Sequence, residues 1–202
     1  METKRVAEKA VKVFRRHGGI LRTGQALAEG IHPRTLYELR DEGRILSLHR
    51  GLYRLADLPP LGNPDLATIA ARLPSAVICL VSALSFHGIT TQIPHQVDIA
   101  LSRGTKGPKL TFPPLRIFRF SPSTFEKGIE THKLDEVKVR IYAPARTVVD
   151  CFKFRNRIGI DVAVEALRLC RQRRVATVRE ILEYARLLRM ERVMTPYLEA
   201  MQ

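Results

Sequence analysis

The sequence contains few cysteines, and their placement limits the kinds of site that the chain can hold. Only three occur in 202 residues, Cys79, Cys151 and Cys170. Each stands alone in an apolar or helical stretch, without the paired spacing that zinc sites and secreted disulfide frameworks require. We therefore expect reduced thiols in the core, no bound metal and a cytoplasmic location.

Long hydrophobic runs and common catalytic motifs are also absent. The longest apolar run, residues 76–84, is interrupted by Ser82 and is far too short to span a bilayer. Residues 1–12 are charged and lack the apolar stretch of a signal peptide. The sequence has no P-loop, no GxGxxG motif and no Ser/His/Asp grouping. We expect no membrane partner, no cofactor and no enzymatic activity.

Acidic residues are scarce relative to basic ones. The chain has 34 Lys and Arg against 20 Asp and Glu, which gives a net charge of +14 and a pI near 10.3. The excess is +5 over residues 1–60, +4 over 61–150 and +5 over 151–202, so it is not a basic tail. A field of this kind favours nucleic acid, an anionic membrane surface or an acidic protein as partner.

Hydrophobic spacing and turn residues predict five short elements at the N-terminus. These are helices over residues 2–16, 24–29 and 33–42, followed by strands over residues 45–48 and 52–55. Thr23 is expected to cap the second helix, and Pro33 occupies the first position of the third, where a missing N–H is harmless. A basic turn, His49-Arg50-Gly51, joins the two strands.

Three helices followed by a β-hairpin is the element order of a winged helix-turn-helix. The next stretch, residues 58–64, contains three prolines and a glycine and is typical of a linker. The predicted fold class is therefore α+β. A DNA-binding winged helix-turn-helix covers residues 1–57, and a mixed α/β domain that ends in helices covers residues 65–202.

The larger domain is predicted from alternating and helical patterns. Strands are expected at residues 76–79, 97–101, 115–120 and 137–142, with a loop over 102–114 and helices at 65–72, 82–87, from 145 onward, and at 159–173, 177–189 and 196–201. Thr177 and Glu180 have the spacing of a capping box.

The third predicted helix has the arrangement that a recognition helix needs. Leu36 and Leu39 share one face and can dock on the domain, while polar side chains near the N-terminus are free to reach base edges. The candidate DNA contacts are Arg22, Thr23, Arg34, Thr35, Tyr37, Arg40 and Arg50. The alternative interpretation is a solvated face of an ordinary amphipathic helix.

Two other functional classes fit parts of the sequence. Asp98, Glu136 and Lys138 match the D…ExK pattern of metal-dependent nucleases, in which two acids on adjacent strands hold the metal. So short a pattern arises often by chance. The third class is an adaptor that binds acidic protein through its charge.

Arg146 and Asp150 form a separate candidate feature. They stand four residues apart in a predicted helix and can pair across one turn. The pair is either a weak ion pair at the surface, or a partly buried pair that fixes the helix against the sheet or contacts a polar ligand. His87, which precedes Gly88, is expected to lie at the C-terminus of its helix.

Several of these stretches together resemble the AbiEi-type antitoxins, which are repressors of type IV toxin–antitoxin systems associated with phage defence in bacteria. The likeness lies in GIHPRTLY (residues 30–37), RGLYRL (50–55), SALSFHG (82–88), PARTVVD (144–150) and PYLEA (196–200). The resemblance implies an N-terminal domain that binds inverted repeats in its own promoter. It also implies a C-terminal domain that counters a nucleotidyltransferase-like toxin, which the antitoxin need not bind directly.

Overall fold

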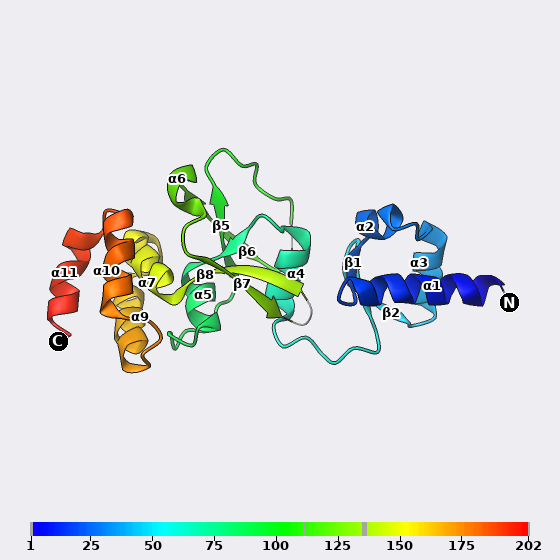
Figure 1. The fold of residues 1–202 in the computed structure, drawn as a ribbon, viewed down its shortest axis with the longest axis horizontal. Helices are drawn as coiled ribbons and strands as arrows, with labels where there is room; N and C mark the ends of the chain where they lie inside the picture. Colours follow the sequence, from blue (N-terminus) through cyan, green and yellow to red (C-terminus); the bar gives the residue numbers. More distant parts are fainter. Residues whose placement is uncertain (1, 111, 135–136, 202) are drawn as a thin grey trace. The chain divides into compact units, whose positions relative to one another are not determined.

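The computed structural model describes residues 2–110, 112–134 and 137–201, with side chains from residue 5 onward. Over these residues the chain is a mixed α+β protein that contains two sheets (Figure 1). Its contacts divide it into two compact units, residues 1–74 with 132–139 and residues 75–131 with 140–202. The linker predicted at residues 58–64 lies between β3 and α4, and the domain boundary placed there stays a prediction.

In its described residues, the first unit combines four helices with a small antiparallel sheet. The elements are α1 (Glu2–Arg16), β1 (Ile20–Arg22), α2 (Thr23–Ala28), α3 (Pro33–Asp41), β2 (Ile45–His49), β3 (Leu52–Leu55) and α4 (Pro64–Arg72). The sheet order is β1-β3-β2. Phe14 of α1, Leu21 of β1 and Leu36 and Leu39 of α3 belong to one buried cluster. Burial of this apolar face holds α2 and α3 as two successive helices against α1 and the sheet.

The second sheet has the order β6-β5-β4-β8-β7. Its strands are β4 (Val77–Ile78), β5 (Val97–Ser102), β6 (Leu115–Phe120), β7 (Ile129–Leu134) and β8 (Val137–Tyr142). β5 pairs in parallel with β6 and antiparallel with β4, and β4 pairs in parallel with β8.

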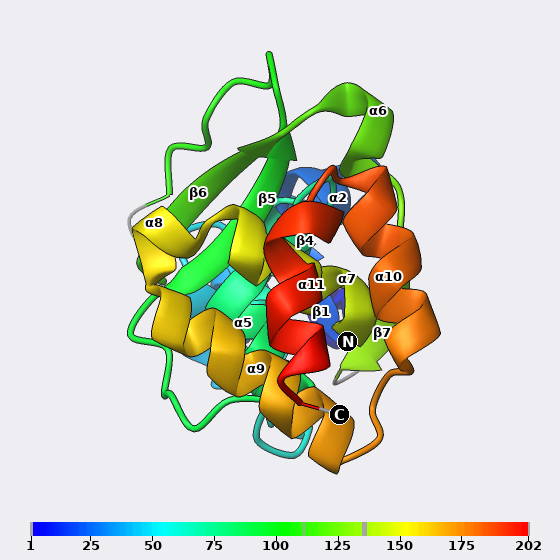
Figure 2. The same cartoon turned by 90° about the vertical axis from the view of Figure 1, so that its left-hand side faces the viewer.

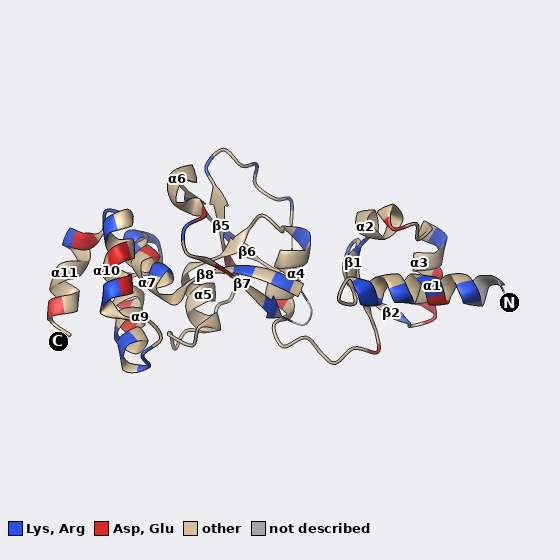
Figure 3. Cartoon of the chain, viewed as in Figure 1, with Lys and Arg blue, Asp and Glu red and all other residues tan. Residues whose placement is uncertain are grey.

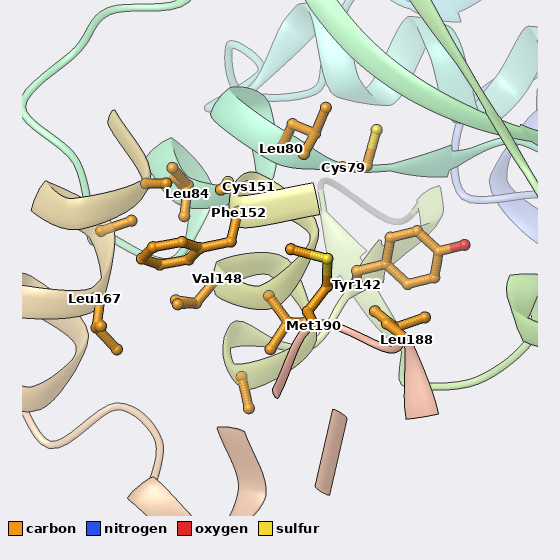
Figure 4. Packing of buried hydrophobic residues seen from close by; sticks show 14 of the residues in the cluster. Cys79, Leu80, Leu84, Tyr142, Val148, Cys151, Phe152, Leu167, Leu188 and Met190 are labelled. Atoms are coloured by element: carbon orange, nitrogen blue, oxygen red, sulfur yellow. The ribbon is translucent and has the colours of Figure 1, made fainter. Parts of the chain in front are cut away.

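Helices complete the second unit, and α7 lies at their centre. They are α5 (Leu80–Phe86), α6 (Pro122–Phe125), α7 (Pro144–Lys153), α8 (Arg155–Ile158), α9 (Ile160–Gln172), α10 (Val178–Leu187) and α11 (Glu191–Glu199). α7 contacts α5, α9, α10 and α11, and Figure 2 views α9, α10 and α11 in front of it. Val148 and Phe152 of α7 pack with Leu84 and Leu167 in the core (Figure 4).

The predicted capping box and core thiols are confirmed. The Thr177 hydroxyl accepts the Glu180 N–H at 3.2 Å, and the Glu180 carboxylate accepts the Thr177 N–H at 2.7 Å. Cys79, Cys151 and Cys170 are free and buried, and burial raises the pKa of each thiol. These cysteines are therefore unreactive packing residues.

The structure differs from the sequence predictions at several elements. β1, α6 and β7 were not predicted, and α11 begins at Glu191 instead of residue 196. Pro196 lies inside α11. Thr23 does not cap α2, because Arg22 is the N-cap residue and Thr23 is the first residue of the helix.

Candidate nucleic-acid interface

Local interactions fix the start of α3, and packing fixes which of its faces is buried. Pro33 is the first helical residue, and Nδ1 of His32 accepts the Arg34 N–H at 3.2 Å as the N-cap. Leu36 and Leu39 are buried against the rest of the unit. The opposite face of α3 therefore points away from the core and carries polar side chains.

Three of the predicted residues, Arg34, Tyr37 and Arg40, are exposed on α3. The Arg34 side chain is 82% exposed, and its Nε donates to Glu38 Oε1 at 2.9 Å. The Arg40 guanidinium lies 5.1 Å from the centre of the Tyr37 ring. It also donates a hydrogen bond to Asp41, and this bond raises the pKa of Arg40. Exposed ion pairs of this kind contribute little to stability, so both guanidinium groups can exchange their carboxylates for phosphate or base acceptors.

The β1–β3 pairing brings Arg22 and Thr23 beside the turn that carries Arg50. Arg22 lies opposite Leu52 in the ladder, and the Thr23 N–H donates to the Gly51 carbonyl at 2.9 Å. Gly51 has φ of +71°, a conformation that favours glycine and allows the tight turn. Arg50 is exposed at this turn, whereas Arg22 and Thr23 are half-buried.

One residue beside the turn was missed by sequence analysis. Arg72, in α4, donates from Nη1 to the Arg50 carbonyl at 2.5 Å and lies 3.2 Å from Nδ1 of His49. No local pattern points to this residue, because the contact joins residues more than twenty positions apart across the predicted linker.

Thr35 is the predicted DNA contact that the structure argues against. Its side chain is buried and lines a cavity between α1 and α3. The helical spacing accounts for this placement, since Thr35 follows Arg34 by 100° of rotation and so turns from the exposed face toward α1.

The D…ExK pattern does not provide a free carboxylate at Asp98. Asp98 is buried in β5, where its Oδ1 accepts Arg116 Nε at 2.7 Å. Its Oδ2 accepts Arg116 Nη2 at 2.8 Å and the Val81 N–H at 3.1 Å. Lys138 lies in β8, and Glu136 is outside the described residues. Within the part of the chain that the structure describes, no three His, Cys, Asp or Glu residues gather as a metal site.

The Arg146–Asp150 pair is fully buried, so the surface interpretation is wrong. Arg146 Nε donates to Asp150 Oδ2 at 2.8 Å, and both side chains have no exposed area. Arg146 Nη1 also donates to the carbonyls of Thr124 and Lys127, at 2.9 and 3.0 Å. The guanidinium lies 4.6 Å from the centre of the Tyr142 ring. The pair therefore ties α7 to α6 and the turn after it.

His87 is the C-cap of α5, as predicted, and its Nε2 lies 2.8 Å from the Tyr142 carbonyl. Among the described residues, no helix is both long and apolar enough to cross a membrane.

Comparison with known proteins agrees with the resemblance seen in the sequence. Residues 8–56 match a family model described as a transcriptional regulator, AbiEi antitoxin. No curated protein matches the chain. The crystal structure of the RV2827C protein from Mycobacterium tuberculosis is similar to 90% of this chain and 71% of that chain, with a TM-score of 0.57 and 14% identity. At this identity the likeness concerns the fold. Over residues 8–56 the chain is thus similar to the AbiEi antitoxins that regulate transcription, which confirms the family resemblance for this region.

Proposed function

We propose that residues 1–57 form a winged helix-turn-helix that binds double-stranded DNA, and that the chain is a transcriptional autorepressor and antitoxin. The observation that carries this proposal is the division of α3 into two faces. Leu36 and Leu39 are buried, while Arg34 and Tyr37 are exposed. A helix held in this way can enter the major groove with its arginine toward the bases.

The remaining contacts follow from the sheet. β2 and β3 are the proposed wing, and Arg50 at its tip reaches the backbone or an adjacent minor groove. Arg22 and Thr23 lie beside that turn and are proposed to contact phosphate. Arg40 and Tyr37 flank the reading positions on α3. The net charge of +14 supports such a role because neutralising phosphates releases counterions.

The antitoxin role is proposed for the second unit. The family description over residues 8–56 supports a transcriptional regulator that serves as an antitoxin. We propose inverted repeats in the protein's own promoter as the DNA site and a nucleotidyltransferase-like protein as the toxin. Direct binding between antitoxin and toxin is not required in this scheme.

The proposed activity is non-enzymatic. Asp98, the first acid of the D…ExK pattern, has both carboxylate oxygens occupied by Arg116 and the Val81 N–H. A carboxylate engaged in this way is a poor ligand for a divalent metal, because binding the metal would leave Arg116 without its partner.

The test is fluorescence anisotropy with a duplex from the protein's own promoter and a scrambled duplex, at several salt concentrations. Arg34→Ala should cost about 1–3 kcal/mol in binding to the promoter duplex and relax preference at one base pair. Glu38→Gln is the matched control, since it frees Arg34 and removes a negative charge near the DNA, and it should bind more tightly. Equal affinity for both duplexes in the wild type would instead support an adaptor that binds polyanions through charge alone.

A further inference from the structure

A cavity of about 620 Å³ lies in the first unit, beside α1, the turn between α2 and α3, and the start of α3. Small-molecule sites in proteins fall in a range of about 300–1,000 Å³. The cavity is large enough for a ligand and lies on the inner side of the proposed reading helix.

The floor of the cavity is apolar. Val6, Ala10 and Val13 line it from successive turns of α1, and Ile31 lines it from the turn between α2 and α3. Val6 is 44% exposed although it faces these apolar neighbours. An apolar body placed here would bury surface that the chain itself leaves open to water.

The rim of the cavity carries positive charge without an assigned counter-ion. Lys9 and Lys12 both line the cavity and are exposed, and neither has an ion pair in the described structure. The acidic residue at the rim, Glu29, is already engaged by Arg16 at 3.3 Å and by His17 at 2.9 Å. Figure 3 shows Lys and Arg along α1. An occupant that carries negative charge is therefore favoured over a neutral or cationic one.

His32 gives the cavity a hydrogen-bond donor. Its Nδ1 accepts the Arg34 N–H, so the neutral ring carries its proton on Nε2. His32 lines the cavity, and its Nε2–H is suited to an acceptor such as a carboxylate. The same ring thus caps α3 with one nitrogen and can meet an occupant with the other.

We infer that this cavity binds a small anionic amphiphile, with an apolar body on Val6, Ala10, Val13 and Ile31 and a carboxylate near Lys9, Lys12 and His32. The occupant acts as an effector of DNA binding, a role that rests on the proposed function. Its negative charge cancels part of the positive field of the first unit and lies near the N-terminus of α3. Occupancy weakens binding to promoter DNA by about tenfold, within the usual range of coupling between two sites.

The binding test uses the full-length protein and two fluorescent probes with the same apolar rings. Anilinonaphthalene sulfonate carries an anionic group, and the uncharged phenylnaphthylamine lacks it. The sulfonate probe should bind at least about tenfold more tightly than the uncharged one. Lys9→Gln combined with Lys12→Gln should remove most of that difference. Arg5→Gln is the matched control, because it removes a charge from α1 at a residue that does not line the cavity, and it should change the affinity less than about twofold.

Equal binding of the two probes would overturn the inference, as would sulfonate binding that the double lysine variant leaves unchanged. The effect on DNA is measured separately by titrating decanoate into the protein–promoter complex, with decanol as the uncharged control. Loss of DNA binding with decanoate alone supports the effector role, and no response to either overturns it. A wild-type protein that fails to bind DNA at all contradicts the proposed function, whereas the probe titration still decides whether the anionic site exists.

Discussion

Replacing Arg146 by alanine removes the cation that lies beside the buried carboxylate of Asp150. The variant leaves that carboxylate without its hydrogen bond from Nε and deprives the Thr124 and Lys127 carbonyls of a donor. Among the described residues, Oδ1 of Asp150 has no hydrogen-bond partner even in the intact pair. Breaking a buried pair from one side typically destabilises a protein by about 3–5 kcal/mol. We expect a loss of this size near pH 7.5.

The pH dependence of the loss follows from Asp150. Burial raises the pKa of Asp150 to about 6 from a usual value of 3.8, against the opposing effect of Arg146. The folded state therefore binds the Asp150 proton more tightly than the unfolded chain does. The protonated carboxyl group contributes stability that is fully present below about pH 4 and is lost as the pH rises to about 6. At roughly 1.4 kcal/mol per pKa unit, this amounts to about 3 kcal/mol in the wild type.

Without Arg146 the pKa of Asp150 rises further, so the same loss continues above pH 6. At pH 7.5 a carboxyl group that stays protonated costs at most about 5 kcal/mol relative to the unfolded chain. The difference between variant and wild type should accordingly shrink by about 2 kcal/mol between pH 7.5 and pH 4.5. The loss of the Arg146 hydrogen bonds to the Thr124 and Lys127 carbonyls accounts for the part that does not depend on pH, although the Thr124 carbonyl still accepts the Lys127 N–H at 3.3 Å.

The assay is urea denaturation followed by circular dichroism at both pH values. Arg179→Ala is the control, because Arg179 and Glu183 have the same four-residue spacing and a similar Nε–Oε1 distance of 3.1 Å but are 88% and 60% exposed. It should cost less than about 1 kcal/mol at either pH. Adding Asp150→Asn to Arg146→Ala should recover stability at pH 7.5, since no carboxylate is then buried. An Arg146→Ala loss no larger than the control, or one that is constant with pH, would refute this reasoning.

Three further predictions concern the division of labour in the chain. Arg50→Ala should weaken binding to all duplexes alike and lower the slope of log affinity against log salt by roughly one counterion; a loss confined to one sequence in an anisotropy titration would assign Arg50 to groove readout. Residues 61–202, expressed alone and checked for folding by circular dichroism, should protect cells from the neighbouring toxin without repressing the promoter, and rescue by residues 1–57 alone would reverse this assignment. Incubation of the full chain with plasmid DNA and Mg²⁺ should give no cleavage on a gel, whereas cleavage that Glu136→Ala abolishes would establish a nuclease.

Helices whose ends carry capping or helix-breaking residues could be predicted from the sequence. Strands that depend on pairing with distant residues could not. α1 ends before Gly18 and Gly19, and α3 begins at Pro33, so local chemistry fixes both boundaries. β1 has only three residues, and its partner in β3 lies about thirty positions further along the chain. Such a strand has no periodicity of its own and exists because the pairing is available.

The candidate site was predictable in outline but not in the orientation of each side chain. Arg34, Tyr37 and Arg40 are exposed as expected from the positions of Leu36 and Leu39. Thr35 lies at the edge of the buried face of α3, next to the exposed Arg34, so a small rotation of the helix determines whether its side chain is buried. The burial of Arg146 could not be predicted in this way, because Ala145, Val148 and Val149 mark a single apolar face, whereas in the structure every residue of α7 from Ala145 to Phe152 is buried.

In the proposed scheme, the two faces of α3 connect DNA reading and regulation in one short helix. Arg34 projects outward, while Thr35 and His32 line the cavity on the inner side. The physical link is the His32 cap, which accepts the backbone N–H of Arg34 itself. A side-chain N-cap contributes about 0.5–2 kcal/mol to a helix, so an occupant that disturbs the cap can shift DNA affinity by no more than about thirtyfold through this route. A larger shift in DNA affinity would mean that the charge of the occupant, and not the position of α3, governs the response. The contribution of charge alone would fall with added salt.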